Sequence, residues 1–152
     1  MRILGIRNTP SVIRYAILDG DKNKSSFINI SEENRLVFPR DMTDINQRIC
    51  WYKYEIDKIL STYGKFDAVA LKHNENIKSN YSRLRDTMYY DAIISLIASC
   101  NVVSIEYFTY GSMKTNSKNI EASCETLYGK TASHWDSQMA DAIYAAYTII
   151  NR

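Results

Sequence analysis

The amino-acid sequence predicts an α/β fold with a mixed five-stranded sheet, in which the first three strands are antiparallel and helices cover both faces. Two observations lead to this prediction. The first thirty residues contain three runs that are typical of β-strands. In the rest of the chain, short apolar runs alternate with longer segments in which apolar residues recur at helical spacing. In addition, the run Arg2–Ile6 is apolar on both faces, which is typical of a strand in the middle of a covered sheet.

The three leading strands are expected at Arg2–Ile6, Val12–Leu18 and Ser25–Ile30. Asn8-Thr9-Pro10-Ser11 separates the first two and predicts a β-hairpin, because β-branched runs flank a short polar turn. Residues 31–39 are polar and predict a connection without regular structure. Arg7 then stands directly after the first buried strand.

Further along the chain, apolar residues recur at helical spacing in four segments. Thr43 is expected to cap the first helix, which Gly64 ends. Ser133 and Asp136 form a capping box that predicts the start of the last helix. His134 would be the second residue of this helix.

The remaining elements follow from shorter patterns. Strands are expected at Phe66–Leu71 and Val102–Phe108, and helices at about Tyr81–Cys100 and Ser117–Tyr128. Lys72 therefore follows the fourth strand. The residues expected on the inward face of the helix that starts at Tyr81 are Tyr89, Ala92, Ile93, Leu96, Ile97 and Cys100.

Composition limits the classes of function. A chain of 152 residues with 45% hydrophobic and 24% charged residues is expected to form one globular domain. The net charge of +2 neither implies nor opposes nucleic-acid binding. Cys50, Cys100 and Cys124 form no CxxC pair and are expected to be buried and reduced, and two histidines provide no zinc-type ligand set. Without a signal-like or membrane-length apolar run, we expect a soluble, cytoplasmic protein.

Four segments, in the same order along the chain, resemble the RNase H-like superfamily and most closely the RuvC-type Holliday-junction resolvases. They are ILGIRNTPSVIRYAIL, FDAVALKHNENI, VVSIEYF followed by GSMKTNSKNIEASCETLYGK, and SQMADAIYAAYTI. The resemblance implies a single RNase H-like domain over residues 1–152 with a RuvC-like sheet. Because similar resolvases dimerise, it also implies a homodimer.

The same resemblance locates a site. Similar enzymes carry an acid after the first strand, one after the fourth strand and two on the last helix, and these positions correspond to Arg7, Lys72, Gln138 and Asp141. Only Asp141 is acidic, so the four positions sum to a formal charge of +1. Hydrolysis with two Mg²⁺ ions held about 4 Å apart requires clustered carboxylates. We therefore assign no catalytic residue and expect no cofactor.

Asp141 has two interpretations. It is either a surviving metal ligand or an ion-pair acceptor for Arg7, Lys72 or both. The two cations in turn either bind an anion such as a nucleic-acid phosphate or only neutralise Asp141.

A basic and aromatic stretch near these positions could also hold a phosphate backbone. The residues that we predict for nucleic-acid or anion binding are Arg7, Lys72, Lys78, Tyr81, Arg83 and Arg85.

The leading hypothesis is a catalytically degenerate RuvC-like module that binds nucleic acid or a protein partner and no membrane. The alternative is a metal-dependent nuclease or resolvase that uses Mg²⁺ or Mn²⁺, with Asp141 as a ligand and acids relocated to Asp67, Glu75 or Glu106. Nucleic-acid binding predicts a continuous basic strip, whereas a protein-interaction role predicts an exposed tyrosine-rich patch.

Overall fold

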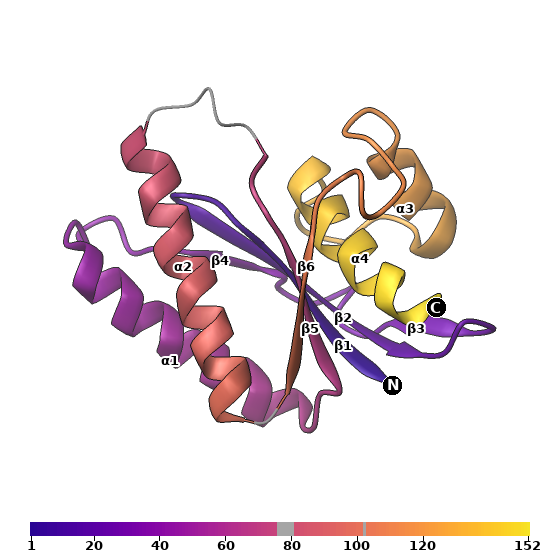
Figure 1. Ribbon diagram of the computed structural model, residues 1–152, viewed down its shortest axis with the longest axis horizontal. Coiled ribbons are helices and arrows are strands. Elements are labelled where there is room, and N and C mark those ends of the chain that lie inside the picture. Colours follow the sequence, from indigo (N-terminus) through magenta and orange to yellow (C-terminus); the bar gives the residue numbers. More distant parts are fainter. Residues whose placement is uncertain (76–80, 102) are drawn as a thin grey trace.

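The parallel strands β1 and β5 lie at the centre of one mixed sheet (Figure 1). The computed structural model describes residues 1–75, 81–101 and 103–152. In this part of the chain the strand order is β3-β2-β1-β5-β6, and β4 pairs with the first residues of β2, whereas β3 pairs with its last residues. The strands are β1 (Arg2–Asn8), β2 (Val12–Gly20), β3 (Ser25–Phe27), β4 (Arg35–Val37), β5 (Ala68–Lys72) and β6 (Ser104–Phe108).

The strand directions confirm the predicted mixed sheet. β1, β2 and β3 are antiparallel neighbours, whereas β5 and β6 run parallel to β1. Ile3, Leu4 and Ile6 are fully buried, so both faces of β1 are covered. The first apolar run is therefore a central strand, as its composition predicts.

Helices cover both faces of the sheet, two on each side (Figure 1). α1 (Ile45–Tyr63) and α2 (Tyr81–Cys100) pack on the face that presents Leu4 and Ile6. α3 (Ile120–Tyr128) and α4 (Ser137–Ile150) pack on the face that presents Ile3. The sheet thus separates two apolar cores. No helix in the described ranges is both long and apolar enough to cross a membrane.

The strands differ from the sequence prediction at the sheet edge. β3 ends at Phe27 instead of residue 30, because the fully buried Asn29 uses its side-chain oxygen to accept the Ile17 N–H at 2.8 Å. A side chain thus replaces the ladder bond of a strand residue. The segment expected to be an irregular connection contains β4, which pairs with the start of β2 and adds a sixth strand.

Helix ends show which caps the fold uses. Asp44, and not Thr43, caps α1 by accepting the backbone N–H groups of residues 46 and 47. Asp136 caps α4 by accepting the Met139 N–H at 2.8 Å, so the predicted start at Ser133 is wrong by one turn. The predicted end at Gly64 is confirmed, and its φ of +79° explains the glycine.

The inward face of α2 was predicted wrongly. The buried residues are Thr87, Tyr90, Ile94, Ile97 and Ala98. Only Ile97 of the six predicted residues is buried; Ile93 is half-buried, and the other four are exposed: Tyr89, Ala92, Leu96 and Cys100. Apolar residues occur all round this helix, so their spacing defines no single face.

The cysteines are a second correction to the predicted core. Cys124 is buried as expected, but Cys50 and Cys100 are both exposed. Each exposed cysteine lies in a helical apolar pattern that sequence alone cannot orient. Of the three thiols predicted to be buried, only that of Cys124 is buried.

Gly5 allows α4 to approach β1 closely. A Cβ atom built on Gly5 would overlap the Ala142 carbonyl oxygen and lie 3.0 Å from the Ala146 Cβ. The residues of α4 near this contact are small, and Ala142, Ala145 and Ala146 are fully buried. The small residues that the sequence places around position 141 therefore pack against the sheet and hold that position beside β1.

Candidate functional site at the carboxyl ends of the central strands

The candidate site lies where β1 and β5 end side by side. Arg7 on β1 is the register partner of Lys72 on β5, so two cationic residues leave the sheet together. α4 crosses this point and presents Asp141. The Arg7 Nε atom lies 3.1 Å from Asp141 Oδ2, and the two side chains are only 12% and 3% exposed. The predicted ion pair between Asp141 and Arg7 is therefore confirmed.

The Lys72 side chain is only 1% exposed, and its carboxylate partner is Glu75 instead of Asp141. Its Nζ atom donates to the Glu75 carboxylate at 2.6 Å and to the His73 carbonyl at 2.8 Å. The ammonium also lies 4.0 Å from the centroid of the Tyr110 ring. Burial lowers the pKa of Lys72, while Glu75 and Asp141 act in the opposite direction. Of the two cations predicted to pair with Asp141, Arg7 does so, whereas the ion-pair partner of Lys72 is Glu75.

Tyr110 completes this buried polar cluster. Its backbone N–H donates to Glu75 at 3.0 Å, and its side chain lies close enough to Asp141 for each group to influence the pKa of the other. Burial, with the nearby Asp141 charge, raises the pKa of Tyr110 far above its usual value. Burial also raises the pKa of Asp141, although Arg7 and Lys72 partly oppose the change. Sequence reasoning missed Tyr110, because it lies in an irregular segment after β6.

A cleft of about 380 Å³ opens beside the Arg7–Asp141 pair. Gln138 and Arg7 line it together with Arg83 at the start of α2, which brings two guanidinium groups to one opening. The other lining residues are polar or small, and none is acidic: Thr9, Pro10, Ser11 and Asn74. A lining with two cations, hydroxyls and amides suits an anion such as a phosphate.

The remaining residues predicted to bind nucleic acid are not all at this cleft. Lys78 lies outside the described residues. Tyr81 and Arg85 are exposed on α2, but neither lines the cleft, and the Arg85 guanidinium lies 3.7 Å from Asp86. Lys72 is buried within its own ion pair. Of the residues predicted to bind nucleic acid, only Arg7 and Arg83 line the cleft.

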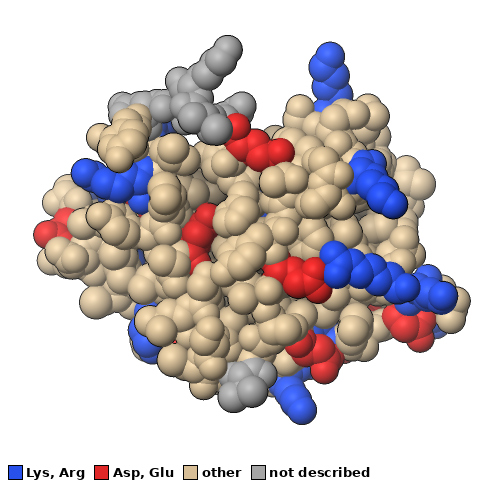
Figure 2. Space-filling view, viewed as in Figure 1, with Lys and Arg blue, Asp and Glu red and all other residues tan. Residues whose placement is uncertain are grey.

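The charge distribution agrees with this result. Figure 2 shows basic side chains as separate groups around the visible face, with acidic side chains between them. This face presents no single basic strip.

The acids that could rebuild a metal site each have another role. Glu75 pairs with Lys72, and Glu106 pairs with Arg152 at 2.6 Å. Asp67 lies at the other end of β5, where it accepts the Arg2 N–H at 2.7 Å. His134 precedes α4, and is not within it, and lies 3.7 Å from Glu33.

The residues at the mapped positions do not fit a pair of Mg²⁺ ions. Within the described ranges, no three His, Cys, Asp or Glu side chains group closely enough to hold a metal ion. Arg7 and Lys72 would also place two positive charges where Mg²⁺ requires oxygen ligands.

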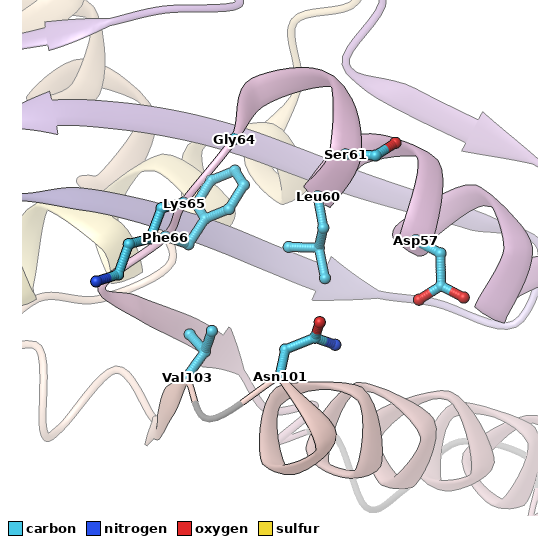
Figure 3. A pocket seen from close by; sticks show the side chains of 8 residues that line it. All are labelled: Asp57, Leu60, Ser61, Gly64, Lys65, Phe66, Asn101 and Val103. Atoms are coloured by element: carbon cyan, nitrogen blue, oxygen red, sulfur yellow. The ribbon is translucent and has the colours of Figure 1, made fainter.

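A larger cavity of about 480 Å³ lies at the opposite end of the sheet, between the ends of α1 and α2 (Figure 3). Three of its polar side chains bond to nearby groups: Asp57 pairs with Lys53, Ser61 donates to the Lys58 carbonyl and Asn101 to the Ile97 carbonyl. In open α/β sheets, ligands bind at the carboxyl ends of the strands. We therefore place the candidate site at Arg7 and not in this cavity.

Comparison with solved structures supports the fold. Thermus thermophilus RuvC in complex with a Holliday junction substrate matches with a TM-score of 0.78 and 12% identity, over 97% of this chain and 92% of that chain. A second T. thermophilus RuvC structure matches with a TM-score of 0.77, 12% identity and the same coverage. The yeast mitochondrial Holliday junction resolvase Ydc2 matches with a TM-score of 0.63 and 13% identity, over 99% of this chain and 78% of that chain.

No protein-family model and no curated protein sequence matches the chain. The structural matches cover nearly the whole chain, and the sheet has the strand order described above. The chain therefore has a RuvC-like RNase H-like fold. Among solved structures, it is similar in fold to T. thermophilus RuvC and to Ydc2.

Proposed function

We propose that this chain is a catalytically degenerate RuvC-like module that binds the phosphate backbone of nucleic acid without cleaving it. The observation that carries the proposal is the buried Arg7–Asp141 ion pair at the carboxyl end of β1. At this position similar enzymes carry a metal-binding acid. A guanidinium there repels divalent cations and attracts phosphate oxygens, so it favours binding over metal-dependent hydrolysis.

The cleft beside this pair supplies the binding surface. Arg83 takes part in none of the ion pairs that join described side chains, whereas Arg7 is held by Asp141. The charge of Arg83 is therefore available to attract a phosphate. Arg7, which Asp141 holds in place, supplies hydrogen-bond donors in a fixed orientation. One of the similar structures is a complex with a Holliday junction substrate, which supports nucleic acid as the ligand class.

The test is binding and cleavage of a labelled four-way DNA junction. We expect binding that weakens steeply between about 50 and 200 mM salt, because phosphate contacts release counterions. Arg83→Ala should weaken binding and reduce the slope of log K against log salt by about 1. Lys118→Ala removes the same charge from an exposed position outside the cleft and should change neither value.

The same junction should remain intact in the presence of Mg²⁺ or Mn²⁺. Cleavage that Asp141→Asn abolishes would contradict the proposal and support a nuclease with relocated acids. Absence of any salt-dependent binding would contradict it as well, and would direct attention to a protein partner. Exposed aromatic side chains that such a partner could contact include Tyr81, Tyr89 and Tyr107.

A further inference from the structure

A second cavity of about 360 Å³ adjoins the cleft, between the end of β5 and the first half of α2. Asn74 lines both spaces, and the successive residues Arg83 and Leu84 line one each. The second cavity has mainly apolar walls, which include Leu84 and Met88, with Asp91 and His73 as its ionisable groups. Its volume lies in the range of small-molecule sites, about 300–1,000 Å³.

The Asp91 carboxylate in this cavity is held from several elements. Oδ1 accepts the side-chain amide of Asn8 on β1 at 2.7 Å, and Asn8 in turn accepts the hydroxyl of Tyr52 on α1 at 2.7 Å. Oδ2 lies 3.1 Å from Nδ1 of His73. Asn8 and Tyr52 are fully buried, so this chain of bonds is fixed within the core.

His73 is held by a stacking contact as well as by Asp91. Its ring stacks on Tyr107 of β6, with centroids 5.0 Å apart and an interplanar angle of 4°. The Tyr107 hydroxyl lies 2.8 Å from the hydroxyl of Ser95 on α2. A carboxylate has about four acceptor positions, so Asp91 retains capacity for a further N–H donor.

From this geometry we infer that the two spaces together bind one nucleotide of a single strand. The phosphate lies in the cleft on Arg7 and Arg83, and the base enters the apolar cavity and donates an N–H to Asp91. A flat base with polar edges matches apolar walls that end in a fixed acceptor. The inference rests on the proposed function, because it assigns the base that belongs to a bound phosphate.

The test compares two labelled ten-nucleotide single strands of DNA, one of mixed sequence and one in which every base is replaced by an abasic site. The strand with bases should bind at least about tenfold more tightly, because each buried base adds favourable contacts. Met88→Trp should fill the cavity and reduce the affinity for the strand with bases to that of the abasic strand. Met88 is 62% exposed, so this change should leave the fold intact.

Leu96→Trp provides the matched control, because Leu96 is an exposed residue of the same helix that does not line the cavity. It should leave the difference between the strands unchanged. Asp91→Asn should reduce the difference as well, since it replaces one acceptor oxygen by a donor. Equal binding of the two strands by the unaltered protein would overturn the inference and leave backbone binding in place. Binding of neither strand, nor of the junction, would overturn both proposals.

Discussion

Strand β1 has one arginine near each end, and each pairs with an aspartate. Arg2 Nη2 lies 2.6 Å from Asp19 Oδ2, with 33% and 35% of the two side chains exposed. Arg7 Nε lies 3.1 Å from Asp141 Oδ2, with 12% and 3% exposed. The exposed pair is the shorter one, yet water screens its attraction, so it contributes little to stability. In the buried pair, removal of either charge would leave the other in the core without its counter-charge.

The two pairs show that burial, and not the distance between the charged atoms, decides how strongly the loss of one partner affects stability. Arg2 joins two strands at the surface, and solvent can replace its partner. Arg7 occupies the position around which the candidate site is built, beside Lys72 and Tyr110. A buried guanidinium that neutralises a carboxylate also determines which ligand the site can accept.

The largest expected effect separates the two pairs directly. Arg7→Met should reduce the free energy of unfolding by about 3–5 kcal/mol, because it leaves Asp141 buried without its main partner. Arg2→Met is the matched control and should cost less than about 1 kcal/mol. Urea unfolding followed by circular dichroism measures both. Equal losses would show that burial does not distinguish the pairs.

The double variant Arg7→Met with Asp141→Leu sharpens this result. Replacing both charges by apolar groups should recover much of the stability lost in Arg7→Met, because no uncompensated charge remains in the core. At the surface pair, the Arg2→Met and Asp19→Leu changes should be nearly additive. A double variant at the buried pair that is no more stable than Arg7→Met would contradict this account.

The second prediction concerns the contact that brings Asp141 to β1. Gly5→Ala should destabilise the fold by about 1–3 kcal/mol, because the added methyl group meets the Ala142 carbonyl and Ala146. Gly111→Ala is the control, because the nearest atom to a Cβ there is the Thr109 hydroxyl at 3.8 Å. Thermal unfolding should separate the two variants. A neutral Gly5→Ala would show that α4 is free to move away from the sheet.

The third and smallest effect compares two aspartates of α4. Burial is the largest influence on the pKa of each. At Asp136, hydrogen bonds from Arg14 and the Met139 N–H outweigh burial and lower the pKa. At Asp141, burial outweighs Arg7 and Lys72, and the pKa is raised.

The two shifts have opposite consequences for stability. As the pH falls through the raised pKa of Asp141, the native state binds the proton before the unfolded chain does, so stability gains from this group. The contribution of Asp136 is present above its unfolded pKa and is lost as the pH falls through its lowered native pKa.

A carboxyl-carbon NMR titration should therefore give a higher midpoint for Asp141 than for Asp136. Arg7→Met should raise the Asp141 midpoint further, and Arg2→Met should leave it unchanged. The reverse order of midpoints would contradict the assigned causes.

The hairpin and the alternating strands and helices were predictable, because a strand such as β1 that is apolar on both faces can lie only inside a covered sheet. The RuvC-like resemblance, and not the apolar pattern, predicted that Asp141 pairs with Arg7, Lys72 or both, and the structure shows the pair with Arg7. The inward face of α2 was not predictable, because its apolar residues surround the helix. Glu75 and Tyr110 were also missed as partners of Lys72, because both lie in irregular segments.

The sequence by itself therefore determined the order of the elements other than β4, the central strand and the residue types at the mapped positions, of which only Asp141 is acidic. These properties depend on local periodicity and residue identity, which can be read along the chain. Only the tertiary structure decided that Lys72 pairs with Glu75, that Arg83 joins Arg7 in one cleft and that Asp91 meets His73. Glu75 lies only three residues after Lys72, but it follows the strand in a segment whose conformation no local pattern predicts. The other two arrangements join residues far apart in the chain, and only the packing of α2 against the sheet brings them together.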